Sequence, residues 1–349
     1  MHARLRERGL SALVSTSSAN SYYLTGFTGE AGALFLSKSR RVLLTDGRFI
    51  QQAKEETRGV EVVKQQASLM DSVGNVAKSL GVRKAGFDAG QLSVSQFRVL
   101  RKAGGRKVKW INAEGEVEAL RQQKSPQEIQ QMRAAAELAV GVLNSVLHLL
   151  KPGVRELELA AEIEYQMRRR GASGPAFESI VAFGERSALP HARPTAKRLG
   201  KNELVVLDLG VILGHYCSDI TRTVFVGRAP KRIREWYRAV QEAQSRAVSA
   251  ARVGASCGDV DAAAREVLAK YKLDKYFVHS TGHGLGLEVH ESPRIARGQQ
   301  QILSAGTAIT IEPGVYVPEI GGIRIEDDVV VHAERTEVLT RFTRDFIEI

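Results

Sequence analysis

Long apolar runs, cysteine-rich segments and low-complexity tracts are all missing from this sequence of 349 residues. No stretch approaches the roughly 18 uncharged apolar residues that a membrane-spanning helix needs. The first ten residues, MHARLRERGL, carry charges where a secretory signal peptide would have its apolar region. The two cysteines cannot build a disulfide framework, and neither belongs to a CxxC or Cys/His cluster. We therefore expect a cytoplasmic protein with reduced thiols and no membrane contact.

Proline and aromatic residues are also few, but the hydrophobic share of 43% is enough for a sizeable core, and the length suggests two domains. The 50 Lys and Arg outnumber the 39 Asp and Glu, which gives a net charge of +11. These basic residues occur in short, separated clusters, at 101–109, 168–170 and 228–234. No aromatic stacking pattern or nucleic-acid module accompanies them, so we expect no nucleic-acid partner.

The first 120 residues alternate short apolar runs with amphipathic stretches, which is typical of an α/β layer structure. The predicted strands are 12–14, 33–36, 41–44, 60–63, 85–87 and 108–111. The predicted helices between them are 48–57, 69–80 and 93–102. We therefore predict an N-terminal α/β domain over residues 1–120.

A strong helix start opens the second part of the chain. Ser125 is a good N-cap, Pro126 suits the first helical position and Glu128 stands at the capping-box position. We place the domain boundary in the polar stretch 112–124 and predict a second domain over residues 121–349. Its predicted helices are 126–150, 154–170, 231–252 and 259–270. Its predicted strands are 178–183, 203–213, 216–226, 307–311 and 323–331.

Two aspartates stand within the otherwise apolar or β-prone segments LVVLDLG and SDITRT. If these segments form a hairpin centred between Leu213 and Gly214, Asp208 and Asp219 lie directly opposite each other, with Cβ atoms about 5 Å apart. Two facing carboxylates repel, and burying them costs several kcal/mol unless they bind a cation. A pair of ordinary hydrogen-bonded aspartates is the alternative interpretation of this hairpin.

A second hairpin repeats the arrangement with glutamates. Glu312 and Glu326 are equidistant from Glu319, which lies in the turn-like segment PEIGG, and strand alternation puts Arg324 on the face of Glu326. Between the two hairpins comes His283 in GHGLG, where glycines allow a close backbone approach. Four carboxylates and one imidazole are the ligand set of a two-metal hydrolase centre.

Taken together, these motifs resemble the M24-type metallopeptidases of the pita-bread fold, which include methionine aminopeptidases, Xaa-Pro aminopeptidases and prolidases. The resemblance covers nearly all of residues 125–349. It rests on the motifs DLG, SDITRT, GHGLGLEVHE, IEPGVY and GGIRIEDD. The segments YLTGFTG and LTDGRF resemble the creatinase-type N-terminal domain of that family. The implied fold is a creatinase-like α/β domain followed by a pita-bread catalytic domain, an α+β domain with a curved antiparallel sheet.

The resemblance also implies residue roles. The implied metal ligands are Asp208, Asp219, His283, Glu312 and Glu326, with Asp219 and Glu326 bridging two ions. Glu312 is further implied as the carboxylate that moves a proton. The implied catalytic groups that do not bind metal are His191, His290, His279 and Arg324, the first two as hydrogen-bond donors to the substrate and Arg324 as the side chain that orients the ligands.

Within the family, the short spacing between the two glutamate motifs and the contexts Leu-Pro-His and Val-His-Glu favour proline-specific members. We therefore expect hydrolysis of Xaa-Pro bonds in small peptides with proline at the second position. Xaa-Pro aminopeptidase activity is the first expectation and Xaa-Pro dipeptidase (prolidase) activity the alternative; a pita-bread binding protein without turnover is the non-enzymatic alternative. The expected cofactors are two Mn²⁺ ions, with Co²⁺, Zn²⁺ and Fe²⁺ as alternatives, and the resemblance implies a homodimer.

The choice between the two activities depends on the far end of the substrate. A dipeptidase must bind the free carboxylate that follows the proline ring, and an arginine can hold it in a bidentate way. Arg294 and Arg193 are the candidates. Because no long insertion closes the predicted cleft, the sequence predicts a preference for Xaa-Pro-Yaa tripeptides over Xaa-Pro dipeptides.

Overall fold

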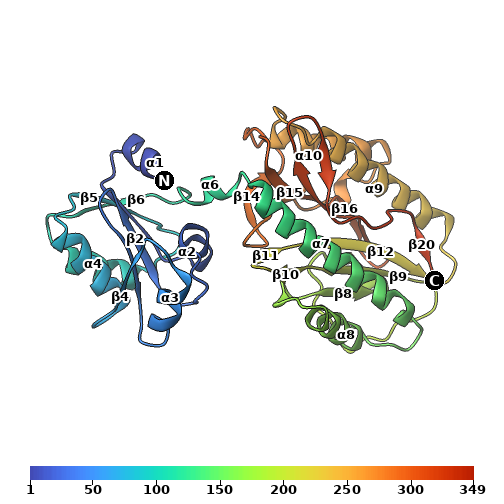
Figure 1. The fold of residues 1–349 in the computed structure, drawn as a ribbon. Coiled ribbons are helices and arrows are strands. Elements are labelled where there is room, and N and C mark those ends of the chain that lie inside the picture. The colour runs from blue at the N-terminus through green and yellow to red at the C-terminus, as the bar shows by residue number, and fades with distance from the viewer. The chain divides into compact units, whose positions relative to one another are not determined.

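The computed structural model describes residues 1–349, apart from the side chain of His2. It divides into two compact units, Met1–Arg121 and Gln122–Ile349, which are described separately here (Figure 1). No helix among the described residues combines the length and the apolar character that crossing a membrane requires.

The first unit is built on a mixed six-stranded sheet in the order β4-β3-β2-β1-β5-β6. Its strands are β1 (Ala12–Ser15), β2 (Ala33–Ser37), β3 (Arg41–Thr45), β4 (Glu61–Lys64), β5 (Lys84–Phe87) and β6 (Lys109–Asn112). The predicted helices of this unit form as α3 (Ile50–Glu56), α4 (Leu69–Ser79) and α5 (Val94–Gly104). All nine elements predicted for this part of the chain are present, with ends that differ by at most two residues.

Three short helices of this unit were not predicted, namely α1 (His2–Glu7), α2 (Ser18–Thr25) and α6 (Glu118–Arg121). Helix α2 shows why, because the residues it buries are polar. Asn20 donates to Ser15 and to Glu118, and it accepts a hydrogen bond from Arg121 at 2.8 Å. Such a helix has no apolar stripe for a sequence pattern to detect.

Most of the net positive charge belongs to the first unit, where residues 1–121 contain 20 Lys and Arg against 11 Asp and Glu. The cluster 101–109 lies on α5 and on β6, which is an edge strand of the sheet. An open cavity of about 840 Å³ is lined by four basic residues of this cluster, Arg101, Lys102, Arg106 and Lys109, together with Phe97, Arg98 and Trp110. A lysine on an edge strand opposes pairing with a second sheet, and Lys109 has this place on β6.

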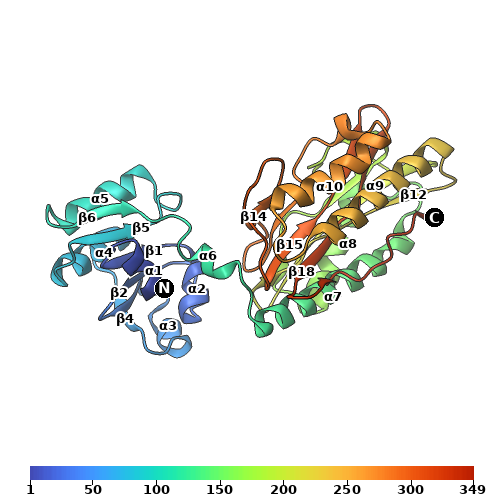
Figure 2. The same cartoon turned by 90° about the horizontal axis from the view of Figure 1, so that it is seen from above.

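The second unit has the expected pita-bread architecture, in which antiparallel strands lie between two pairs of helices (Figure 2). The helices are α7 (Pro126–Val146), α8 (Glu156–Arg169), α9 (Lys231–Ala250) and α10 (Cys257–Lys270). The strands that place the site are β8 (Ile180–Phe183), β9 (Glu203–Leu209), β12 (Ile220–Val226), β13 (Gly282–Gly284), β14 (Glu291–Ile295), β15 (Thr307–Ile311) and β18 (Asp327–Val331).

Smaller strands complete the second unit. They are β7 (Gly174–Pro175), β10 (Val211–Leu213), β11 (Tyr216–Cys217), β16 (Gly314–Val317), β17 (Gly321–Arg324), β19 (Thr336–Val338) and β20 (Ile347–Glu348). Among the described strands of the second unit, only β20 pairs in parallel, with β12.

Each helix pair has its own hydrophobic core against one part of the strand layer. Helices α7 and α8 pack on β8, β9 and β12, while α9 and α10 pack on β15, β16 and β17. The α-helix predicted over 126–150 ends at Val146 and continues as a 3₁₀ turn over Leu147–Leu149. The site residues lie on the strands and on the loops between them.

Three strands predicted as continuous, 203–213, 216–226 and 323–331, are interrupted, and Gly210 marks one of the breaks. It separates β9 from β10, where Ser218 donates its amide to the Val211 carbonyl and its hydroxyl oxygen accepts the Val211 amide. A Cβ atom at Gly210 would lie 2.1 Å from the Ser218 carbonyl oxygen. Only glycine fits there, because the neighbouring atom belongs to the backbone.

We predict that Gly210→Ala destabilises the second unit by about 1–3 kcal/mol, since overpacking forces backbone shifts. Urea unfolding can be followed through Trp236 fluorescence in a Trp110→Phe background, so that the signal reports on this unit alone. Gly141→Ala is the matched control. Gly141 lies inside α7 with only the flexible Arg170 side chain nearby, so alanine there should be neutral or stabilising. Equal effects of the two substitutions would contradict the prediction.

Candidate metal centre

Asp208 and Asp219 come from the first strand pair, but in a different register from the one predicted. Asp208 pairs with Thr221 across β9 and β12, so the direct opposition of Asp208 and Asp219 was wrong. The turn is centred on Gly214 and His215, whose φ values of 54° and 72° make a two-residue hairpin turn. The register therefore differs by two residues from the predicted one. Because strand side chains alternate with period two, both carboxylates still lie on one face.

Glu312 and Glu326 come from the second strand pair, whose predicted register is confirmed. Ile311 pairs with Asp327 on one side of the glutamates, and Gly314 pairs with Arg324 on the other. Both pairings are symmetric about residue 319, as the sequence predicted. The two glutamates thus occupy facing positions where the paired strands bend apart.

His283 reaches the carboxylates because two glycines flank it on β13. A Cβ atom at Gly282 would lie 1.9 Å from the Thr310 carbonyl oxygen, and one at Gly284 would lie 2.2 Å from that of Ser292. The glycines thus allow β13 to fit closely between β15 and β14. This confirms the close backbone approach predicted for the GHGLG segment.

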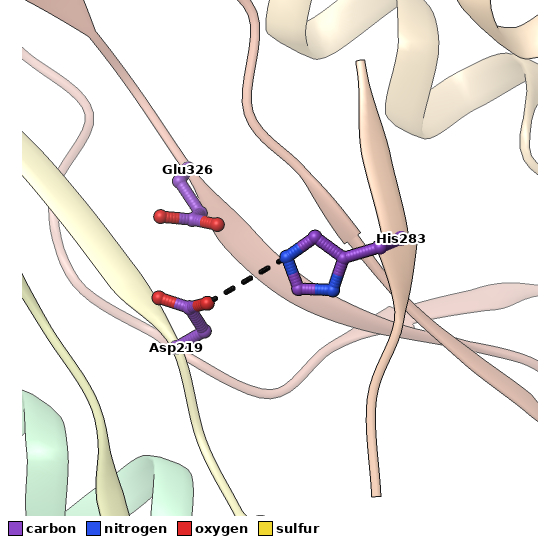
Figure 3. A group of neighbouring side chains, drawn as sticks. All are labelled: Asp219, His283 and Glu326. Atoms are coloured by element: carbon purple, nitrogen blue, oxygen red, sulfur yellow. Dashed lines mark ion pairs between the residues drawn. The ribbon is translucent and has the colours of Figure 1, made fainter. Parts of the chain in front are cut away.

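The ring of His283 points into the carboxylate cluster (Figure 3). Its Nε2 atom lies 3.8 Å from Asp219 Oδ2 and 3.5 Å from Glu312 Oε1. Ligand atoms of Asp219, His283 and Glu326 all lie within 4.8 Å of one another. The structure therefore brings these three side chains into one group, with Glu312 beside it.

The proton of the His283 ring is on Nδ1, the nitrogen that points away from the carboxyl groups. Nδ1 is 2.9 Å from the Gly284 carbonyl oxygen, which can only accept, so Nδ1 carries the hydrogen. Burial lowers the pKa of His283 to about 4, and the ring is neutral. An unprotonated Nε2 therefore faces the oxygens of Asp219 and Glu312, and all three groups are acceptors once the carboxyl groups are ionised. A cation between them resolves this arrangement.

Asp208 is held by Arg324, which also links it to Glu326. Arg324 Nη2 lies 2.5 Å from Asp208 Oδ2, and Nε donates to Thr221 Oγ1 at 3.0 Å. Thr221 in turn donates to Glu326 Oε2 at 2.5 Å. This places Arg324 where the sequence put it, beside the carboxylates and on the face of Glu326.

The site gathers four carboxyl groups that are largely shielded from water, with 17% of the Glu312 side chain exposed. Burial, reinforced by neighbouring carboxylates, raises the pKa of Asp219 and Glu326 well above the usual range. Burial likewise raises the pKa of Glu312 to about 7. Within the described part of the chain, Asp208 Oδ1 and Asp219 Oδ1 are buried without a hydrogen-bond partner. An oxygen-rich set with one imidazole and unpartnered oxygens fits divalent cations.

The three further histidines surround this cluster. His290 packs edge-on against His283 with ring centroids 4.4 Å apart, and its pKa is lowered by burial and by the nearby His191. His279 donates from Nδ1 to the Ser280 carbonyl and accepts from Tyr316 at Nε2. Tyr316 accepts from Arg324 at 2.6 Å. His279 therefore reaches the cluster through Tyr316 and Arg324.

Two residues at the centre, Thr221 and Asp328, were not predicted as site residues from the sequence. Thr221 bridges Arg324 and Glu326 as described, and Asp328 accepts the backbone amide of Asp219 at 2.9 Å. Both stand inside the motifs DITRT and RIEDD, so the motifs were the only signal for them. Their contacts depend on partners more than 100 residues away, which local patterns do not show.

The two candidate arginines for a substrate carboxylate occupy different environments. Arg294 lies directly opposite His283 in the β13–β14 pair, and cross-strand partners share a face of the sheet. It makes no ion pair among the described residues. Arg193 is paired with Glu178 at 3.1 Å, with 84% of its side chain exposed. Of the two, Arg294 is the one placed on the ligand face.

Comparisons with known proteins match both units of the chain to one family of metallopeptidases. Residues 130–333 match metallopeptidase family M24, and residues 1–123 match the creatinase/prolidase N-terminal domain. An Xaa-Pro dipeptidase of Pyrococcus furiosus is 36% identical over 345 residues, covering 98% of this chain and 96% of that protein. The structure of an Xaa-Pro dipeptidase from Bacillus anthracis has a TM-score of 0.96 at 38% identity, covering 100% of this chain and 98% of that one. An X-Pro aminopeptidase structure from Thermotoga maritima has a TM-score of 0.90 at 34% identity, covering 99% and 100%.

The raised carboxylate pKa values predict a pH-dependent stabilisation by metal. In the folded, metal-free protein, the carboxyl groups of Asp219, Glu326 and Glu312 keep their protons above about pH 4, whereas in the unfolded chain they release them. Their contribution to stability therefore falls as the pH rises towards about 7, the pKa of Glu312. We expect Mn²⁺ to raise the Tm of chelator-treated protein more at about pH 7.5 than at about pH 5.5, where protons compete with the metal.

Differential scanning fluorimetry with and without Mn²⁺ at both pH values measures this effect. In an Asp219→Asn variant the Mn²⁺-dependent increment should shrink at both pH values. An increment that is larger at the acidic pH would show that the buried carboxylates do not hold the cation.

Proposed function

Because the chain belongs to metallopeptidase family M24, we propose that it is an Xaa-Pro dipeptidase that hydrolyses the bond before a C-terminal proline. The observation that carries the proposal is the group of acceptors around His283, with Arg294 on the same face of the sheet. The relatives named Xaa-Pro dipeptidase at 36% and 38% identity support the dipeptidase over the aminopeptidase that the sequence favoured.

The ligands of the proposed centre are the five residues that the sequence singled out. Asp208, Asp219, His283, Glu312 and Glu326 would hold two divalent cations, and the oxygen-rich set favours Mn²⁺. Cations at such a site supply Lewis-acid polarisation of the scissile carbonyl and lower the pKa of water. Arg324 and Thr221 fix the orientation of Asp208 and Glu326 from behind.

Other side chains of the site would act on the substrate and on protons. His191 and His290 are proposed to donate hydrogen bonds to the substrate carbonyl and to the oxyanion that develops from it. Glu312 is proposed to accept a proton and return it to the leaving nitrogen, and Thr310 orients it with a hydroxyl 3.4 Å from Oε1. His279 would keep Tyr316 and Arg324 in place through its hydrogen bond to the tyrosine.

Proline itself sets the demands on the pocket. The Xaa-Pro amide has no N–H, so recognition must use the ring and the carbonyl or carboxylate groups on either side of it. A dipeptide ends in a carboxylate next to the ring, and Arg294 can bind it with two parallel hydrogen bonds. A homodimer stays a prediction from the family resemblance.

Replacing a proposed ligand should remove metal and activity together. In Asp219→Asn and Glu326→Gln, we expect metal content per chain to fall and the hydrolysis of Xaa-Pro dipeptides to drop below detection, because each residue is assigned to both ions. Elemental analysis and a proline-release assay measure the two effects. Chelation should abolish the activity and added Mn²⁺ should restore it. A metal-loaded protein that hydrolyses no proline peptide would instead favour a binding protein without turnover.

Substrate length separates the dipeptidase from the aminopeptidase. We expect a higher kcat/KM for an Xaa-Pro dipeptide than for the Xaa-Pro-Yaa tripeptide with the same Xaa. A dipeptide whose C-terminal carboxylate is replaced by an amide should also have a low kcat/KM. Arg294→Ala should lower kcat/KM for the dipeptide by about 10- to 100-fold and leave the tripeptide nearly unchanged, since it removes a charge-assisted hydrogen-bond pair.

Arg193→Ala is the matched control, because Arg193 is paired with Glu178 and should not contribute to carboxylate binding. A tripeptide preference that Arg294→Ala leaves intact would reassign the protein as an Xaa-Pro aminopeptidase.

A further inference from the structure

The histidine proposed to donate to the substrate, His191, stands on a loop with little regular structure. The loop follows β8, passes through a short 3₁₀ turn at Gly184–Ala188 and is irregular from there to residue 195. Leu189 and His191 on it are exposed. A donor on such a loop is useful only if the loop has one position, because catalysis tolerates little misplacement of groups.

One carboxylate holds both ends of this loop. Glu156, the first residue of α8, is completely buried. It accepts the Phe183 amide at 3.0 Å and the Arg186 Nε at 3.1 Å on the incoming side of the loop. On the outgoing side it accepts the Thr195 amide at 2.8 Å and the Thr195 hydroxyl at 2.6 Å. The two ends of the loop are thus fixed to a single side chain.

Arg186 connects Glu156 to the part of the loop that follows His191. Its Nη2 donates to the Arg193 carbonyl at 2.7 Å, while its Nε stays on Glu156. The residue before His191 is bound from the other side, because the Pro190 carbonyl accepts from Arg324 Nη1 at 3.2 Å. The same guanidinium holds Asp208. The loop is therefore fixed between Glu156 behind it and the carboxylate cluster in front of it.

We propose that Glu156 is a positioning residue that sets the place of His191 relative to the metal centre. The proposal rests on the role of His191 in the proposed function. Glu156 touches neither the candidate ligands nor His191, and it acts through Phe183, Arg186 and Thr195. A buried carboxylate with four donors has one arrangement of lowest energy, because each unmet bond would leave a buried polar group unsatisfied.

A purely structural role is the competing explanation, since a carboxylate at the first turn of α8 also stabilises that helix. The two explanations differ in whether the effect of replacing Glu156 depends on the presence of His191. A structural residue lowers the amount of folded protein whatever stands at position 191. A positioning residue loses its effect on turnover once the histidine that it positions is gone.

Glu156→Gln tests this, because the amide keeps the size of the side chain but turns a donor towards the Thr195 and Arg186 donors. We expect metal content to be unchanged and kcat for a Xaa-Pro dipeptide to fall by about 10- to 100-fold. His191→Ala should lower kcat by about 10²–10³. The double variant should be no more than about threefold below His191→Ala, which shows that the two residues act as a unit.

Glu337→Gln is the matched control. Glu337 is also a buried carboxylate of the second unit, with bonds to Arg133, His332 and Arg341, but it holds no loop of the site. Its effect on kcat should be small and should multiply with that of His191→Ala. Hydrogen–deuterium exchange gives a readout that does not depend on activity: Glu156→Gln should speed exchange of the Phe183 and Thr195 amides, and Glu337→Gln should not.

Unchanged exchange in Glu156→Gln would overturn the proposal, and so would faster exchange with fully multiplicative kinetics. If His191→Ala keeps full activity while the wild type hydrolyses the dipeptide, Glu156 has no donor to position and the inference fails alone. If the wild type binds metal but hydrolyses no proline peptide, the proposed function fails, and the inference falls with it whatever the exchange shows.

Discussion

The strands of the second unit hold several hydrogen-bond acceptors close together and largely shielded from water. This arrangement costs free energy in the absence of a cation. His283 turns its unprotonated nitrogen towards Asp219 and Glu312 because the Gly284 carbonyl takes the ring proton. No neighbouring donor satisfies Asp219 Oδ1 in the part of the chain that the structure describes. Arg324 supplies one positive charge, too little for four carboxylates. The surrounding strands keep the acceptors together because strand pairing and core packing fix their backbones, and a divalent charge at the centre would remove the cost.

The register of the two strand pairs shows how far the sequence alone can place such a site. The turn around Glu319 is symmetric between its strands, so the facing of Glu312 and Glu326 was predictable. The first turn lies one residue later than predicted, because Gly214 and His215 both adopt positive φ. Moving a turn centre by one residue shifts the pairing by two, which changes the partner of Asp208 but leaves its face unchanged. Asp208 and Asp219 therefore share a face of the sheet despite the error in the predicted register.

Residues that hydrogen-bond to the candidate ligands were less predictable than the candidate ligands themselves. Thr221 and Asp328 act through contacts with residues more than 100 positions away, and Glu156 bonds a loop that begins 27 residues later. Period and capping rules report on neighbours within a few residues, so they place helices such as α7 but not these contacts. Helix α2 was missed for a related reason, because its buried face is a polar network formed with Arg121 and Glu118.

Buried carboxylates also support the loops of the three site histidines that are not candidate ligands, His191, His279 and His290. Glu156 bonds both ends of the His191 loop. Next to His290, Glu291 is paired with the buried Lys124 at 3.0 Å and accepts the Glu288 amide, which closes that loop. Near His279, Asp261 accepts from Thr281 and pairs with Arg265, whose guanidinium holds the His279 carbonyl. Strands position the ligands by backbone pairing, whereas these histidines stand on loops that pairing does not fix. Buried carboxylates with several donors supply the missing rigidity. Substrate preference in such a site can therefore change through residues behind the loops while the metal ligands stay the same.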